Sequence, residues 1–313
     1  MNDNSERVSD CLHSKEVLMA KSELEYQERD RIRGMIAGNV LGDMLGYPME
    51  GGTGMLEPYP PLKITHRCVR DIEKVFWTDD TAMLLALGAS MDENSGKVNP
   101  ESERKHYVKW FLDGDYTPDG IPYGYGKTTR EAILKGNPVT DRLSNGNGAL
   151  MRSSIISAYY IDKTDSELQE ASGISCSVTH GHPVSIFTNI IYNFLLKKIL
   201  TGYSLSKGFK LAKEKYYDIM PDTNEIFQKP VFYSVTPYCV TTLQTAIFVN
   251  LESESFEEAL VKSVNLGGDT DTIGAVTGAI AGAIYGFDGI KSTFKEKISI
   301  ITAKYSFIGK FFE

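Results

Sequence analysis

The chain has 313 residues, of which 42% are hydrophobic and 24% are charged, and this balance is ordinary for a soluble globular protein. A net charge of -8 argues against a nucleic-acid binder that works by neutralising phosphates, because such a protein needs a basic face. The four cysteines lie far apart without a CxxC pair, so neither a structural zinc site nor a disulfide framework is expected.

Targeting signals are also missing from the pattern. The first ten residues, MNDNSERVSD, are polar and lack the apolar stretch of a secretory signal. The most apolar long stretch, residues 274–287, is too short to span a bilayer. We therefore expect a cytoplasmic protein that does not enter membranes, and we expect it to be a monomer.

The predicted elements are helices joined by polar or glycine-rich loops. Residues 1–28 are charge-rich and are predicted to form an N-terminal extension, and residues 29–313 are predicted to form one large domain. No segment alternates with period two between turn signals, so the fold class is predicted to be all-α. Apolar residues recur at helical spacing in residues 31–46, 81–91, 105–114, 130–136, 153–161, 165–178, 183–200, 205–220, 238–251, 256–266 and 273–286.

The last of these helices carries a stripe of glycines. Gly274, Gly278 and Gly282 are spaced four residues apart, on one helix face. A glycine in a helix interior costs about 1 kcal/mol relative to alanine. We interpret the stripe as the contact face for another backbone that approaches very closely.

Two short acidic segments each precede an apolar helix. The first is WTDDTAM, residues 77–83, and the second is GGDTDT, residues 267–272. Taken singly, each is a good helix start, because Ser, Thr and Asp cap helices and acidic residues suit the helix dipole. The second segment is not an EF-hand, because Ile280 stands where the loop needs a bidentate glutamate.

The two segments offer more oxygen atoms than two caps require. If Asp79, Asp80, Asp269 and Asp271 converge, their repulsion calls for a cation between them. Such hard oxygen ligands suit Mg²⁺, Mn²⁺ or Ca²⁺ rather than zinc, and their hardness favours Mg²⁺ or Mn²⁺. Independent caps and a shared metal site both remain open at this point.

A third segment, LSNGNGALMR at residues 143–152, has two glycines around Asn147. Backbone N–H groups freed by such glycines before a helix can hold a phosphate, although a plain turn has the same composition. Neither the dinucleotide fingerprint nor the P-loop motif is met here or at YGYGKTT. His180 and His182, in VTHGHP, lack the spacing of a metal pair on a helix.

Together and in this order, the segments resemble the ADP-ribosylglycohydrolase family. The resemblance covers roughly residues 30–290 and includes RIRGMIAGNVLGDMLGYPME, WTDDTAM, YGYGKTTREAILKG, SNGNGALMR, VTHGHP and VNLGGDTDTIGAVTGAIAGAIYG. It implies a single all-α domain with a cleft for two divalent cations, Mg²⁺ or Mn²⁺. The resemblance departs at Val184, where an arginine is expected soon after VTH.

The resemblance also assigns roles by position. The implied metal ligands come from both acidic segments: Thr78, Asp79, Asp80, Asp269, Asp271 and Thr272. The implied catalytic residues are the acidic side chains Glu50, Asp79 and Asp80. The implied substrate-binding residues come from two glycine-rich loops and the VTH segment: Gly124, Gly126, Ser144, Gly146, Asn147, Gly148, Ala149 and His180.

The implied activity is hydrolysis of the C1″ bond between ADP-ribose and a protein side chain or a small molecule. The diphosphate is expected to rest on backbone N–H groups from Gly146 to Ala149. Nucleic acid enters only as a modified substrate. The alternatives are a non-catalytic ADP-ribose-binding or crystallin-like relative, and a metal-dependent phosphoesterase that would release phosphate or AMP.

Overall fold

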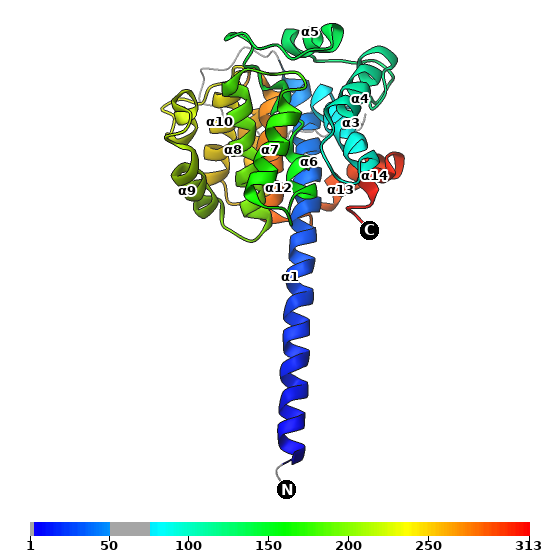
Figure 1. Cartoon of the computed structure of the whole chain (residues 1–313), viewed down its shortest axis with the longest axis vertical. Coiled ribbons are helices and arrows are strands. Elements are labelled where there is room, and N and C mark those ends of the chain that lie inside the picture. Colours follow the sequence, from blue (N-terminus) through cyan, green and yellow to red (C-terminus); the bar gives the residue numbers. More distant parts are fainter. Residues whose placement is uncertain (1–2, 51–75) are drawn as a thin grey trace.

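A computed structural model describes the backbone of residues 3–50 and 76–313, and side chains from residue 22 onward (Figure 1). Among these residues there is no β-strand, and only two isolated bridges, Val139–His180 and Gly146–Tyr238, pair extended segments. The helices are α1 (Asp3–Gly46), α3 (Asp79–Glu93), α4 (Pro100–Asp113), α5 (Lys127–Lys135), α6 (Ser154–Tyr159), α7 (Asp165–Cys176), α8 (Pro183–Leu200), α9 (Leu205–Tyr216), α10 (Cys239–Leu251), α11 (Phe256–Val264), α12 (Thr270–Tyr285), α13 (Ser292–Lys304) and α14 (Ser306–Gly309), with 3₁₀ turns η1 (Tyr47–Met49), η2 (Asn147–Ala149) and η3 (Pro221–Phe227).

The predicted all-α class is confirmed, and α8 has the predicted bounds. Two differences have local causes. Helical spacing was predicted only from residue 105, but α4 already begins at Pro100, because the Asn99 side chain accepts from the N–H groups of Glu101 and Ser102, each at 3.1 Å. The helices α13 and α14 were not predicted; they carry few buried residues, among them Phe294, Ile298 and Ile308.

The core is organised around α1 and α12, whose backbones touch. A Cβ atom added at Gly38 would lie 2.0 Å from the carbonyl oxygen of Gly278, and one at Gly42 would lie 1.9 Å from that of Gly274. Gly34 meets Gly282 in the same way. As residue numbers rise along α1, the contacted residues on α12 have falling numbers, so the two helices run antiparallel. The predicted role of the glycine stripe is confirmed, with a matching stripe on α1 as its partner.

This contact places the carboxyl end of α1 beside the amino end of α12. The Thr270 hydroxyl donates to the carbonyl of Gly46 at 2.8 Å, which joins the last turn of one helix to the first turn of the other. Asp43 on α1 and Asp271 on α12 are thereby buried at the same end of the domain. The fold has brought together two regions that are more than two hundred residues apart.

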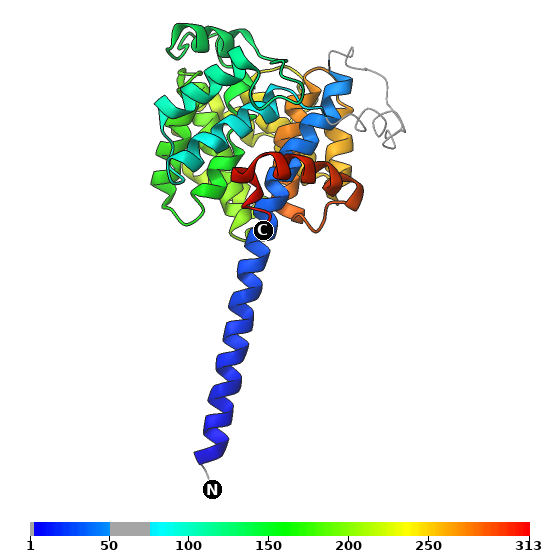
Figure 2. The ribbon, with the colours of Figure 1, turned by 90° about the vertical axis from the view of Figure 1, so that its right-hand side faces the viewer.

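The N-terminal part of α1 projects away from the other helices (Figures 1 and 2). The helix runs without a break through the predicted boundary between residues 28 and 29. Burial begins at Ile32, so the packed part of α1 starts close to that boundary. No helix in the described part of the chain is both long and apolar enough to cross a membrane.

The glycine contact predicts a strong dependence of stability on side-chain size. We expect Gly38→Ala to lower the free energy of unfolding by about 2 kcal/mol or more, because the methyl group would overlap the Gly278 carbonyl. The matched control is Gly173→Ala on α7, whose Cβ would meet Ile186 at 3.5 Å, an ordinary contact. Urea denaturation measures both, and equal stability of the two variants would contradict the close packing.

Candidate functional site

The first acidic segment is anchored by Asp43, a buried carboxylate on α1. It accepts from the Thr78 N–H at 3.1 Å, from the Thr78 hydroxyl at 2.9 Å and from the Thr81 N–H at 3.0 Å. Asp43 therefore accepts hydrogen bonds from N–H groups at the start of α3 that have no partner within the helix, and so it acts as a helix cap. This role was missed in the sequence because Asp43 lies inside a helix, 35 residues before its partner.

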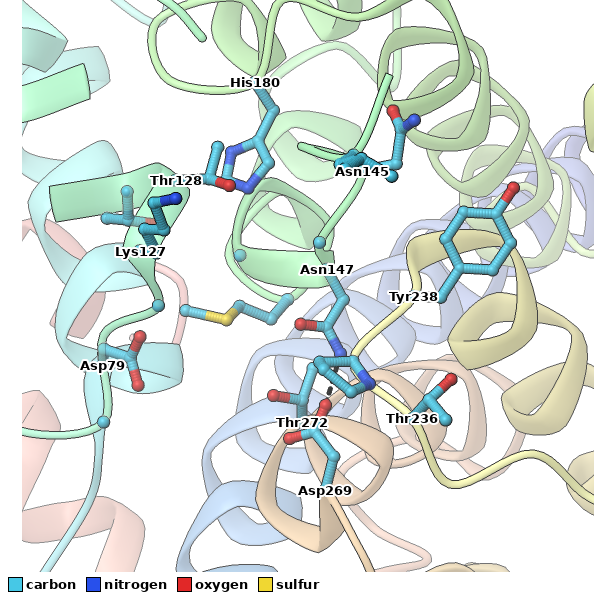
Figure 3. Close-up of a pocket in the computed structure, with 18 of the residues that line it drawn as sticks. Asp79, Lys127, Thr128, Asn145, Asn147, His180, Thr236, Tyr238, Asp269 and Thr272 are labelled. Atoms are coloured by element: carbon cyan, nitrogen blue, oxygen red, sulfur yellow. Dashed lines mark hydrogen bonds between the residues drawn. The ribbon is translucent and has the colours of Figure 1, made fainter. Parts of the chain in front are cut away.

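The second acidic segment meets the first at the start of α12. The Thr272 hydroxyl donates to Asp80 Oδ2 at 3.4 Å, and this bond joins residues 192 positions apart. Asp79, Asp269, Asp271 and Thr272 line one cavity of about 1150 Å³. In Figure 3, Asp79 faces Asp269 and Thr272 across this space. Thr78 and Asp80 are buried and do not line the cavity.

Burial and mutual repulsion raise the pKa values of these carboxyl groups. The pKa of Asp79 is raised well above its usual value by burial and then by Asp43. The pKa of Asp80 is raised well above its usual value by burial and then by Asp271. Burial, followed by the charge of Asp269, raises the pKa of Asp271 to about 10. Such shifts mark a site that holds unfavourable negative charge.

The donor atoms suit a hard divalent cation. Asp80 Oδ1 is buried without a hydrogen-bond partner. Within the described residues, no group of three or more His, Cys, Asp or Glu side chains is placed to hold one metal ion. Mg²⁺ commonly uses only one or two carboxylates and completes its shell with water and substrate oxygens. The residues therefore fit such an ion in chemistry and charge, without forming a closed protein cage.

Glu50 stands at the rim of the same cavity. Its side chain lines the cavity, and its pKa is raised by burial and then by the charge of Asp269. The rings of Tyr47, Phe76 and Tyr123 pack together nearby, with centroids 4.7 to 6.3 Å apart. The N–H of Glu50 donates to the carbonyl of Tyr47 at 3.1 Å, which places this aromatic cluster beside the rim, and the pKa of Tyr123 is raised by partial burial and then by Glu50. The cluster and Glu50 form one end of the site.

The loop before α5 approaches the first acidic segment very closely. Gly124 has a φ of 89°, and a Cβ atom there would lie 2.3 Å from Asp79 Oδ1. Only glycine fits both the backbone conformation and the space. Gly126 also lines the cavity and is the N-cap residue of α5.

The glycine-rich segment at residues 145–148 lines the wall next to α12. The Asn147 amide donates to Asp269 Oδ2 at 2.6 Å and to the Thr242 hydroxyl at 3.0 Å, so it ties this loop to the second acidic segment. The backbone N–H of Asn147 donates to the Pro237 carbonyl at 2.9 Å. The expectation that every N–H from Gly146 to Ala149 is free for an anion therefore needs correction at Asn147.

Two expected binding residues lie off the cavity. The Ser144 hydroxyl donates to Asp141 at 2.7 Å, and Ala149 is buried under the loop; neither lines the cavity. Two cationic side chains that were not predicted, Lys127 and Arg142, do line it. A lone exposed basic residue carries no sequence signal, but the position of these two side chains on the cavity wall suits an anion.

His182 and Val184 line the cavity, as does His180, which is almost fully buried. The Nδ1 atom of His180 lies 2.8 Å from the Thr179 hydroxyl. Burial, followed by the charge of Arg152, lowers the pKa of His180 to about 3. The imidazole is therefore neutral at physiological pH. Val184, in place of an expected arginine, leaves this part of the wall apolar.

Comparison with known proteins agrees with this architecture. Residues 24–306 match the model of the ADP-ribosylglycohydrolase family. ADP-ribosylarginine hydrolase Tri1 of Serratia proteamaculans is 26% identical, with 88% of this chain and 76% of the relative covered. The ADP-ribosyl-[dinitrogen reductase] glycohydrolase of Rhodospirillum rubrum is 27% identical, with 87% and 91% covered. A solved structure described as an ADP-ribosylglycohydrolase-related protein complex superposes with a TM-score of 0.71 at 26% identity, covering 90% of this chain and 99% of that one.

The chain thus belongs to the ADP-ribosylglycohydrolase family, because the family model covers most of its length. The predicted resemblance and the single all-α domain are both confirmed. The family and the relatives support hydrolysis of an ADP-ribose linkage as the activity of this chain.

The raised pKa values predict how stability changes with pH. The folded protein binds protons at Asp79, Asp80 and Asp271 more tightly than the unfolded chain, so stability should fall as pH rises above about 4. In EDTA, we expect the thermal midpoint to fall between pH 5 and pH 9 on the order of several degrees.

Removing one of the carboxylate charges should reduce this loss of stability with rising pH. In EDTA at pH 8, Asp271→Asn should stabilise the protein by roughly 1.4 kcal/mol or more, the free energy of one pKa unit. Asp113→Asn, at the exposed end of α4, is the matched control and should change nothing. A wild-type midpoint that rises with pH over this range would contradict the assignment of trapped negative charge.

Proposed function

We propose that this chain hydrolyses the C1″ glycosidic bond of ADP-ribose attached to a protein side chain, with two Mg²⁺ or Mn²⁺ ions as cofactors. One observation carries the proposal. Two acidic segments, residues 78–80 and 269–272, meet at one end of a cavity that is also lined by a glycine-rich loop, Lys127 and Arg142. The cavity thus has a carboxylate-rich end and an end suited to an anion.

The division of charge matches the substrate. A diphosphate is negative, and it would lie towards the glycine loop, Lys127 and Arg142. The distal ribose would then reach the acidic wall formed by Asp79, Asp269 and Asp271. The reacting C1″ carbon would face Glu50 and the open rim.

The bound cations would supply Lewis-acid character and a template for the ribose hydroxyls and a water molecule. Asp79 and Asp271 would hold them, with Asp80, Asp269, Thr78 and Thr272 as the remaining protein ligands. Asp43 would keep the first segment in place through its bonds to Thr78 and Thr81.

The acidic side chains would stabilise the positive charge that develops at C1″ and would accept a proton from the attacking water. Cleavage at C1″ proceeds through an oxocarbenium-like transition state, which nearby carboxylates stabilise. Glu50 has a raised pKa, which suits a general base at the rim that takes a proton from the attacking water. Asp79 and Asp80 are the other candidates for orienting that water.

We infer further that the acceptor is cationic, and arginine fits best. The aromatic cluster of Tyr47, Phe76 and Tyr123 stands beside Glu50. A guanidinium group is attracted both to aromatic faces and to a carboxylate. One relative is named as an ADP-ribosylarginine hydrolase, which supports this choice.

The test is release of ADP-ribose from arginine-linked, serine-linked and O-acyl-linked substrates, followed by mass spectrometry. With Mg²⁺ or Mn²⁺, we expect the arginine-linked substrate to be cleaved fastest, and EDTA should abolish release. Asp79→Asn and Asp271→Asn should each lose roughly 100-fold or more in rate, because the reacting groups would no longer be held in place. Asp113→Asn should retain full activity.

Three outcomes would contradict the proposal. Full activity in EDTA would exclude the metal mechanism. Release of AMP or phosphate in place of intact ADP-ribose would indicate a phosphoesterase. Calorimetric binding of ADP-ribose without turnover of any linkage would indicate a non-catalytic binding protein.

A further inference from the structure

Arg152 is a fully buried guanidinium that does not line the cavity. Its Nη1 donates to the Gly148 carbonyl at 3.0 Å, and its Nη2 donates to the Thr179 hydroxyl at 2.9 Å. The first bond holds the glycine-rich loop, and the second reaches the residue that contacts His180. One side chain therefore supports two separate parts of the cavity wall.

The charge of Arg152 is compensated behind the cavity. Its Nη2 lies 3.7 Å from Glu103, and its guanidinium carbon lies 4.4 Å from the ring centre of Tyr107. Glu103 is itself held by the hydroxyls of Tyr107 and Ser175, at 2.7 and 2.8 Å. This arrangement fixes the guanidinium, because a buried cation without such partners would be strongly unfavourable.

The hydrogen bonds of the Thr179 hydroxyl determine which ring nitrogen of His180 carries the proton. The hydroxyl oxygen accepts a hydrogen bond from Arg152. Within residues 76–313, the side chains that form hydrogen bonds with this hydroxyl are Arg152 and His180. The Thr179 proton is therefore donated to His180 Nδ1, since this is the arrangement in which the proton has an acceptor. A neutral imidazole that accepts at Nδ1 carries its own proton at Nε2.

The Nε2 side of His180 lies against the glycine-rich loop. A Cβ atom at Gly148 would lie 3.2 Å from His180 Cε1 and 3.6 Å from Nε2, and one at Gly146 would lie 3.7 Å from Nε2. Figure 3 shows the imidazole directed into the cavity, on the side of Lys127 and Thr128. Burial and the Arg152 charge lower the pKa of His180 to about 3, so the ring stays neutral.

We propose that Arg152 and Thr179 are positioning residues, which hold His180 in its Nε2–H form as a neutral hydrogen-bond donor to an anionic group of the ligand. Arg152 keeps this donor aligned with the glycine loop, because it binds the Gly148 carbonyl at the same time. The identity of the anion as a diphosphate rests on the proposed function, but the proton arrangement does not. Because the ring does not titrate near neutral pH, its hydrogen bond to the anion is available throughout that range.

The direct test is long-range ¹H–¹⁵N NMR of the full chain with ¹⁵N-labelled histidine, with His180 assigned by loss of its signals in His180→Gln. We expect wild-type His180 to show the Nε2–H tautomer, unchanged between pH 5.5 and pH 8. In Thr179→Val, the population of this tautomer should fall towards that of a free histidine side chain, because the hydroxyl that donates to Nδ1 is removed. An Nδ1–H tautomer or an imidazolium in the wild type would overturn the proposal, as would an unchanged tautomer in Thr179→Val.

Binding supplies a second readout that does not require turnover. The Kd for ADP-ribose, measured by calorimetry, should rise about three- to tenfold in Thr179→Val, the effect of one hydrogen bond. His180→Gln places an amide donor near the position of Nε2 and should retain more affinity than His180→Asn. The reverse order would contradict a donor at Nε2.

The matched control is Thr188→Val on α8. Thr188 is also a buried threonine, but its hydroxyl donates to the Val184 carbonyl within its own helix. This variant should keep both the wild-type tautomer and the wild-type Kd. If hydrolysis is absent while the NMR and calorimetric results hold, the proposed function fails and the positioning role of Arg152 and Thr179 stands.

Discussion

The contact between the backbones of α1 and α12 determines where the functional groups lie. The two glycine rows let the helix axes approach until carbonyl oxygens occupy the space of the missing side chains. As a result, Asp43 near the end of α1 and residues 270–272 at the start of α12 share one buried region. Asp43 then holds Thr78 and Thr81, which brings the start of α3 to the same place.

In the absence of a cation, this clustering of carboxylates lowers the stability of the folded protein. Burial of several carboxylates in one region raises their pKa values, and each shift reflects the unfavourable free energy of the charged form. Apolar residues of similar size would make a more stable core. The cluster is therefore best explained by function, since a fold usually departs from its most stable arrangement at a functional site. A divalent cation would turn the repulsion among these groups into attraction.

Much of the architecture could be predicted from the chain itself, because helical periodicity and the Gly274, Gly278 and Gly282 stripe depend on local sequence. The two acidic segments were also recognisable, because each combines several oxygen-bearing residues at a helix start. Asp43, Lys127 and Arg142 could not be found in this way. Asp43 sits inside a buried part of α1, whereas Lys127 is the exposed first residue of α5 and Arg142 lies in an exposed loop, so only tertiary packing reveals what they face. The hydrogen bond from the Asn147 N–H to the Pro237 carbonyl likewise joins distant segments, so the sequence does not reveal it.

The central claim, that the two acidic segments share divalent cations, is tested most directly by crystals grown with Mn²⁺ and an anomalous difference map measured at the manganese edge. We expect two peaks between residues 78–80 and 269–272, next to Asp79 and Asp271. The peaks should disappear in Asp271→Asn crystals and remain in Asp113→Asn crystals. A map with no peak between the two segments at saturating Mn²⁺ would show that they do not share divalent cations.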